Sequence, residues 1–123
     1  MKTTNSGKAT LRIRQREIYL TQYPFSSGLE CKVRPALILS NSRYNSAQRD
    51  VLASPITSKT GHTDYSVVLD DTKLEEGKLK QICKIRCDKI GTLERGLLLH
   101  KIGRLNAETF EQVKTEIFAV IAE

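Results

Sequence analysis

The apolar residues of this sequence lie in short segments separated by polar turns, and this pattern limits the folds that the chain can adopt. A brief apolar run, or alternation of apolar and polar side chains between turn residues, is typical of β-strands. Such segments occupy residues 17–23, 36–39, 51–56, 65–69, 80–88 and 97–105. A chain of 123 residues with this pattern predicts one mainly β domain, either a small barrel or a strongly bent antiparallel sheet.

The C-terminal segment is the one that is patterned as a helix. Asn106 is a suitable N-cap, and Leu105 before it can pack on Phe110 as a hydrophobic staple. Apolar residues then recur at helical spacing, at Phe110, Val113, Ile117, Val120 and Ile121. We expect this stripe to pack on the core of the domain.

Prolines and polar stretches give further expectations. Pro35 is expected to be the first residue of its strand because it lacks an N–H group, and Pro55 is expected to need an edge or a bulge. The pattern predicts a polar loop over residues 41–49 and a charged connection over residues 70–77. Residues 1–15 are expected to form a flexible basic arm, and residues 16–123 a single domain.

Positive charge is concentrated in the first half of the chain. The formal net charge is +6, and residues 1–59 carry ten Lys and Arg against three acidic residues, whereas the rest carries ten against eleven. A basic surface favours polyanions, because each phosphate that it neutralises releases counterions. The alternative is a solvated basic surface that has no partner.

The cysteines and histidines lack the spacing of a metal site. Cys31, Cys83 and Cys87 are odd in number, and the polar N-terminus does not resemble a secretory signal, so we expect reduced thiols in a cytoplasmic protein. On a strand, Cys83 and Cys87 would lie roughly 13 Å apart, which is too far to share one ion. His62 and His100 have no ligand spacing to a cysteine. We therefore expect no metal, no cofactor and, with no long apolar run, no membrane span.

The segment at residues 80–88 is the most informative for chemistry. On a strand, Cys83, Ile85 and Cys87 share one face, which is apolar enough to point to the core. The other face then displays Arg86 and Asp88 about 6–7 Å apart at their Cα atoms, which lets both act on one phosphate. The alternative is a plain ion pair on one face of a strand.

Two other segments place side chains suited to phosphate at the ends of strands. Arg34 stands in the sequence KVRP, and Thr57 and Ser58 stand before Lys59. A guanidinium matches phosphate oxygens in a fork-like geometry, and hydroxyl groups add small donors. Each segment alone is weak evidence for a phosphate site, since such residues are common at strand ends.

Taken in order, three segments resemble the MazF/PemK (Kid) family of bacterial toxin endoribonucleases. They are YPFS and KVRPALILSN within residues 23–41, PITS at residues 55–58, and RCDK at residues 86–89 followed by KIGRL at residues 101–105. The resemblance runs from about residue 16 to the C-terminus, and the RCD sequence is most similar to the PemK/Kid branch.

The resemblance implies a fold, an activity and partners. The implied fold is an SH3-like barrel of the CcdB type with a C-terminal α-helix. The implied function is that of a type II toxin–antitoxin toxin, a homodimer that cleaves single-stranded mRNA at specific sequences without a metal. A cognate antitoxin neutralises such toxins by covering the RNA groove.

The resemblance also assigns residues. Arg34, Thr57, Ser58, Arg86 and Asp88 match catalytic positions, with Arg86 as acid and Asp88 as base. We also expect Ser26, Lys32, Lys59 and Lys84 to contact the RNA. Some PemK-like members place a catalytic histidine before the KVRP segment, whereas residues 26–32 contain none.

Two other functions remain open from the sequence. A fold of the CcdB type is also used by gyrase poisons, which act by protein contact, so fold alone does not decide the function. The other alternative is a barrel that binds RNA without cleaving it. Cleavage of RNA in the presence of EDTA separates the three hypotheses.

Overall fold

Eight strands and two α-helices make up the part of the chain that the computed structural model describes, which is residues 12–24, 31–59, 61 and 64–123. The strands are β1 (Glu17–Pro24), β2 (Cys31–Ile38), β3 (Asp50–Thr57), β4 (Ser66–Leu69), β5 (Leu74–Gly77), β6 (Cys83–Arg86), β7 (Gly91–Glu94) and β8 (Leu98–Leu105). The helices are α2 (Ser42–Ala47) and α3 (Ala107–Ile121), and two 3-10 turns are η1 (Asp71–Lys73) and η2 (Arg95–Leu97).

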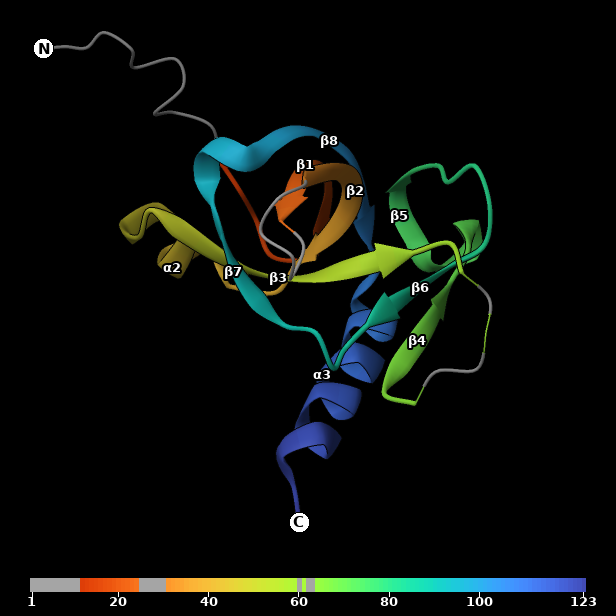
Figure 1. Ribbon diagram of the computed structural model, residues 1–123. Coiled ribbons are helices and arrows are strands. Elements are labelled where there is room, and N and C mark those ends of the chain that lie inside the picture. The colour runs from red at the N-terminus through yellow and green to blue at the C-terminus, as the bar shows by residue number, and fades with distance from the viewer. Residues whose placement is uncertain (1–11, 25–30, 60, 62–63) are drawn as a thin grey trace, which may run out of the picture.

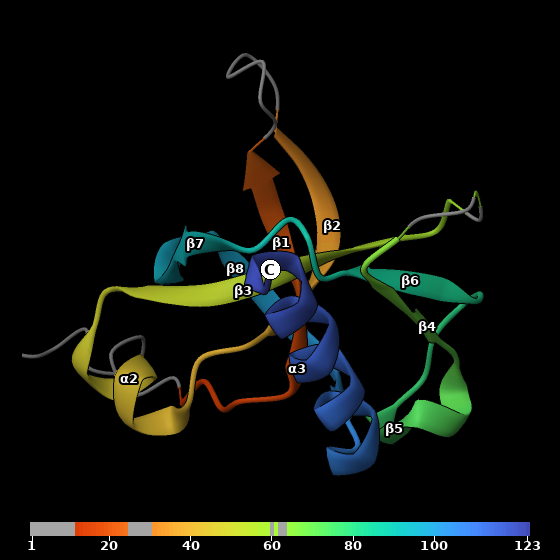
Figure 2. The same ribbon diagram turned by 90° about the horizontal axis from the view of Figure 1, so that it is seen from below.

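The strands form one curled antiparallel sheet in the order β4-β6-β3-β2-β1-β8-β5, and β7 pairs with the first half of β3. Figure 1 shows the curl of β1, β2 and β8, with α3 running down from the sheet. Figure 2, seen from below, shows α2 and β4 at opposite sides of the molecule. The prediction of a mainly β, barrel-like fold with a C-terminal helix is therefore confirmed.

Side chains alternate between two separate apolar cores. The first core lies between the sheet and α3 and contains Ile18, Leu37, Ile56, Val67, Leu69, Cys83, Ile85, Cys87, Leu105, Phe110 and Val113. The second lies on the other face and contains Ile13, Tyr19, Ala36, Ile38, Val51, Ala53, Leu93 and Leu98. Because neighbours such as Ile18 and Tyr19 enter different cores, the central strands are buried on both faces.

Pro35 and Pro55 lie inside strands, at points where the pairing on one side has a gap. Pro35 is the fifth residue of β2 and not its first residue, and the pairing of β2 with β3 stops beside it, at Ala36. Pro55 lies in β3 between Ala53, the last residue paired with β7, and Ile56, the first paired with β6. A missing N–H is tolerated at such gaps.

The structure corrects several expected elements. Helix α2 replaces the polar loop of residues 41–49, and the Asn41 side chain caps it by accepting the Tyr44 N–H at 2.8 Å. Strand β5 falls within the expected charged connection, and β7 was not expected at all. Strand β6 is shorter than the predicted segment and ends at Arg86, so Asp88 lies in the turn that follows.

The apolar stripe of α3 is core for half of its length. Asn106 caps the helix as predicted, because its side chain accepts the Thr109 N–H at 2.8 Å. Phe110 and Val113 are buried, whereas Ile121 is 74% exposed. The prediction of core packing for the last turn was therefore wrong, since that end of α3 extends beyond the strands (Figure 1).

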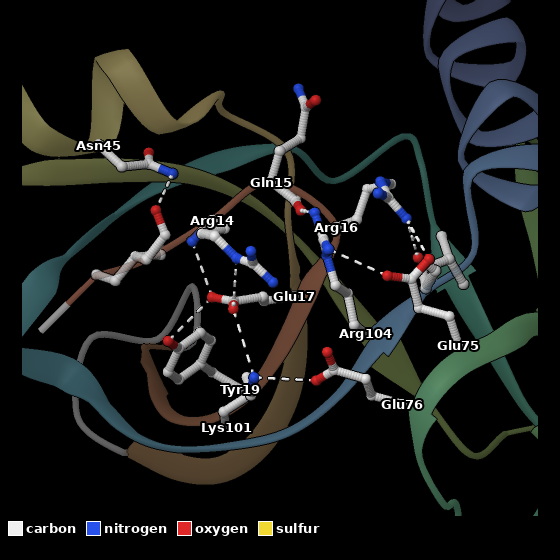
Figure 3. Close-up of polar contacts among 12 residues, drawn as sticks. Arg14, Gln15, Arg16, Glu17, Tyr19, Asn45, Glu75, Glu76, Lys101 and Arg104 are labelled. Carbon is white, nitrogen blue, oxygen red and sulfur yellow. Dashed lines mark hydrogen bonds and ion pairs between the residues drawn. The ribbon is translucent and has the colours of Figure 1, made fainter.

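A buried carboxylate secures the start of β1 (Figure 3). Glu17 is 3% exposed and accepts hydrogen bonds from the Arg14 N–H at 2.8 Å and from the Tyr19 hydroxyl at 3.1 Å. Lys101 of β8 lies 3.6 Å from the same carboxylate and 3.0 Å from that of Glu76 in β5. These charges compensate the cost of burying Glu17, and they tie β1 to β8 and β5.

A second group of charges sits beside the first. Arg16 and Arg104 each lie 3.0 Å from a Glu75 carboxylate oxygen, and Arg16 also donates to the Leu105 carbonyl at 2.7 Å. Arg16 holds a left-handed backbone, with φ of 78°, between these contacts. Ile13, at the end of the expected N-terminal arm, is buried in the second core, and residues 1–11 lie outside the described residues.

Candidate active site

Strand pairing places three of the expected residues on one face of the sheet. Thr57 of β3 pairs with Lys84 of β6, and Arg86 follows two residues later on the same face. Ile56 and Ile85, their neighbours, pair on the opposite face and belong to the first core. The pairing of β2 with β3 ends at Ala36 and Pro55, so Arg34 lies beyond it.

Arg86 and Asp88 form a two-pronged ion pair at the end of β6. The Arg86 Nε donates to Asp88 Oδ1 at 2.9 Å, and Nη2 donates to Oδ2 at 2.8 Å. The side chains remain 24% and 28% exposed, so solvent reaches them. The sequence predicted this face correctly, because Cys83, Ile85 and Cys87 are all buried.

Each member of the pair stabilises the charged form of the other. The hydrogen bond from Arg86 lowers the pKa of the Asp88 carboxyl below its ordinary value, and the hydrogen bond to Asp88 raises the pKa of the Arg86 guanidinium. Asp88 is therefore a carboxylate at neutral pH. Arg86 holds its proton more firmly than a free arginine, which makes it a poor proton donor.

A cavity of about 430 Å³ lies beside Arg34. Arg34 and Lys32 of β2 line it together with Ser58, which directly follows β3. Its other lining residues are Leu20, Val33, Pro35, Ile56, Lys78, Leu79, Lys80, Gln81, Cys83 and Ile102. The cavity thus combines an apolar wall with lysine side chains, which suits a planar base with phosphates on either side.

The turn after β3 joins the two groups of residues. Thr57 Oγ1 accepts the Lys59 N–H at 3.2 Å, and Lys84 Nζ donates to the Gly61 carbonyl, which holds this turn against β6. Thr57 belongs to the face of Lys84, and the adjacent Ser58 lines the cavity of Arg34. The turn therefore connects the cavity with the face that carries Arg86.

One predicted RNA-binding residue lies outside the described part of the chain, and two residues of the cavity were not predicted. Ser26 falls outside the described residues, so its predicted place near RNA has no structural account here. Lys78 and Lys80 line the cavity, although the sequence analysis did not single them out. In the sequence, these two residues stand out only as a local excess of lysine. Their place at the cavity depends on the fold, which brings residues 78–81 to Arg34.

The described residues contain neither a metal-ligand group nor a membrane-spanning helix. No three His, Cys, Asp or Glu side chains in the described ranges are grouped so that they can hold a metal ion. None of the helices in that part of the chain is long and apolar enough to cross a bilayer.

The fold and this arrangement of residues define a small, mainly β protein with a curled half-barrel sheet and a C-terminal helix, and comparison with known proteins gives its family. A family model described as "PemK-like, MazF-like toxin of type II toxin-antitoxin system" matches residues 14–121. The chain therefore belongs to the PemK/MazF toxin family, as the three sequence segments predicted. A search of curated proteins found no match.

Solved structures agree with the fold. The Mycobacterium tuberculosis toxin MazF-mt6 has 25% sequence identity and a TM-score of 0.70, with 85% of this chain and 95% of that chain covered. A mycobacterial endoribonuclease has 19% identity and a TM-score of 0.71, covering 89% and 91%. A MazE–MazF complex from Deinococcus radiodurans has 18% identity and a TM-score of 0.72, covering 89% and 96%.

Proposed function

We propose that this toxin is an endoribonuclease that cleaves single-stranded mRNA without a metal ion. The observation that carries the proposal is the Arg86–Asp88 pair, which is exposed on the same face as Thr57 and Lys84. The similarity of the fold to that of a mycobacterial endoribonuclease also supports the proposal. The described residues supply a carboxylate, cations and hydroxyl groups, which are the groups that phosphodiester transfer requires.

The nucleophile in the proposed reaction belongs to the RNA itself. The 2′-oxygen attacks the adjacent phosphorus, the new bond from phosphorus to the 2′-oxygen forms, and the bond to the 5′-oxygen breaks. Asp88 accepts the 2′-hydroxyl proton, and the leaving 5′-oxygen takes a proton from water. The products are a 2′,3′-cyclic phosphate and a 5′-hydroxyl end.

In this proposal Arg86 acts through its charge. The resemblance assigned it the role of acid, but its raised pKa disfavours proton transfer. It instead binds a phosphate oxygen and stabilises the negative charge of the transition state, together with Arg34, Thr57 and Ser58.

The substrate must compete with Asp88 for the same guanidinium. A phosphate oxygen that binds Arg86 takes over hydrogen bonds that now go to the Asp88 carboxylate. Loss of this partner removes the main cause of the lowered Asp88 pKa. Substrate binding therefore makes Asp88 a stronger base at the moment when a base is required.

The remaining cations position the strand. We propose that Lys32, Lys59 and Lys84, with Ser26, contact the phosphates on either side of the cleaved bond. Such contacts depend strongly on salt, because counterions are released on binding.

We further propose that the protein acts in the cytoplasm as a homodimer and that a cognate antitoxin neutralises it. One similar mycobacterial structure is titled as an endoribonuclease in complex with its cognate antitoxin, and the Deinococcus radiodurans structure contains MazE. In this proposal, an antitoxin for this chain blocks RNA binding by covering the cationic face that carries Arg86.

The test is incubation of the purified protein with single-stranded RNA in excess EDTA. Cleavage under these conditions, abolished in Asp88→Asn and retained in Glu111→Gln, is the expected result. Glu111 is a matched control because it is an exposed carboxylate on α3 that pairs only locally, with Lys114 at 2.8 Å. Activity that disappears on chelation and returns with Mg²⁺ contradicts the proposal, and binding without cleavage supports the non-catalytic barrel.

A further inference from the structure

Tyr65, the residue before β4, has an unusual backbone. Its φ is 57°, in the left-handed region that side chains bearing a Cβ rarely adopt. Among the described residues, Arg16 is the other non-glycine residue with a positive φ, and the contacts to Glu75 and Leu105 account for it. For an aromatic residue such a conformation is strained, and it persists only where the surroundings impose it.

The surroundings of Tyr65 are the segment that carries the catalytic pair. The Tyr65 carbonyl accepts the N–H of Cys87 at 2.9 Å, and Cys87 is the residue between Arg86 and Asp88. Ser66, the next residue, pairs directly with Arg86. The Tyr65 backbone is therefore fixed beside the Arg86–Asp88 pair.

The left-handed backbone also keeps the ring at the surface. If β4 continued backward in its register, Tyr65 would stand opposite Cys87, whose side chain is fully buried in the first core. Tyr65 is instead 43% exposed. The chain thus accepts backbone strain and leaves a large aromatic side chain in solvent, next to the residues proposed to act on RNA.

We propose that the Tyr65 ring is a stacking platform for one base of the RNA substrate. Single-stranded nucleic acids bind where cations follow the backbone and an aromatic ring offers its face to a base. Lys84 and Arg86 provide the cations on the neighbouring strand. This inference rests on the proposed function and adds to it the residue that holds a base beside the cleaved phosphate.

The experiment measures binding of a randomised pool of single-stranded RNA octamers that carry 2′-O-methyl groups and are not cleavable. Tyr65→Phe keeps the ring and is expected to bind like the wild type. Tyr65→Ala and Tyr65→Asn lose the ring and are expected to bind roughly tenfold more weakly or worse. Asn tolerates the left-handed backbone, so this variant stays folded even if Tyr65→Ala does not.

Tyr44→Ala is the matched control. Tyr44 is also exposed, at 36%, but it belongs to α2, at the opposite side of the sheet from β4 (Figures 1 and 2). It is expected to bind like the wild type. Wild-type binding by folded Tyr65→Asn, or equal losses in Tyr65→Phe and Tyr65→Asn, overturns the inference.

A parallel cleavage assay on natural RNA separates this inference from the proposed function. If the wild type binds the pool but cleaves no natural RNA, the endoribonuclease proposal fails while the comparison of Tyr65 variants still reports on stacking. If the wild type cleaves RNA and Tyr65→Asn binds and cleaves equally well, only the stacking role is wrong.

Discussion

The Arg86 guanidinium and the Asp88 carboxylate share two hydrogen bonds, of 2.9 and 2.8 Å, across a turn in which only Cys87 stands between the two residues. Strand β6 ends at Arg86, so Asp88 is free of the alternation that governs the strand and can turn its oxygens toward the guanidinium. In the proposed mechanism a phosphate can reach this guanidinium, because it is held in a partly exposed position.

We expect Asp88→Asn to fold normally and to lose cleavage. An exposed ion pair contributes about 0–1 kcal/mol to the free energy of unfolding, so its loss has little effect on the fold. Removal of a general base lowers the rate on the order of 10²- to 10⁴-fold. The measurement is kcat on a defined RNA beside the melting temperature; a folded variant with full activity rules out Asp88 as the base.

The pH profile of cleavage follows from the same pair. Because the folded-state pKa of Asp88 is lowered, the carboxylate persists above and somewhat below its ordinary value of about 4 and is lost as pH falls through the lowered pKa. The acid limb of kcat/KM, which reports the free enzyme, is therefore expected below pH ~4. Circular dichroism at each pH separates loss of the base from unfolding, and an acid limb near neutral pH would point to a different base.

Arg34 is expected to matter for rate more than for stability. It lines the cavity beside Ser58, where it can bind an oxygen of the transition state. Arg34→Ala should lower kcat on the order of 10²-fold. Arg43→Ala, which removes an exposed arginine from α2, is the control and should retain activity. Equal rates in the two folded variants would place Arg34 outside the reaction.

Substitutions on the two faces of β6 should have different effects on stability and activity. Ile85 is fully buried in the first core, so Ile85→Ala is expected to lower the free energy of unfolding by roughly 2–5 kcal/mol through the cavity it leaves. Activity per folded molecule should be kept. Ile82→Ala removes the same side chain from a position that is 60% exposed, and it should change stability by less than about 0.5 kcal/mol. Urea titration compares the two variants, and similar values would contradict the assignment of the faces.

The sequence predicted the parts of the fold that depend on local patterns. The alternation around Ile85 and the cap at Asn106 are visible in the sequence because each depends on near neighbours. Strands β5 and β7 were missed because each has only four residues and is mostly charged or polar, and their partners, β8 and β3, lie far away in the chain. Tertiary pairing decided their structure, and local propensity did not.

The candidate site was predictable in part for the same reason. Arg86 and Asp88 are close in the sequence, so their proximity could be predicted from it, although Asp88 lies in the turn after β6 and not on the strand. The cavity joins residues 78–81 to Arg34 through strand order, and the strained backbone of Tyr65 depends on a hydrogen bond to Cys87. Neither feature has a signal in a single sequence.

The buried thiols are expected to be unreactive in the folded protein. Burial, followed by the charges of Glu116 and Asp88, raises the pKa of the Cys87 thiol to about 12, and burial also raises that of Cys83. In a Cys31→Ser variant, iodoacetamide at pH 8 should label neither thiol until denaturant is added. Mass spectrometry reads the result, and rapid labelling of the native variant would show that the first core is open.

The central claim is that the RNA supplies its own nucleophile. Removal of the single 2′-hydroxyl group that would attack the phosphorus tests this claim most directly. After the cleavage site is mapped on a natural RNA, an oligomer of that sequence is prepared with a single 2′-deoxy nucleotide immediately 5′ of the cleaved bond. The account predicts that wild-type protein in EDTA cuts the all-RNA oligomer to a 2′,3′-cyclic phosphate and a 5′-hydroxyl end, binds the deoxy oligomer and leaves it intact. Cleavage of the deoxy oligomer at the same bond would contradict the account, because water or a protein side chain would then be the nucleophile.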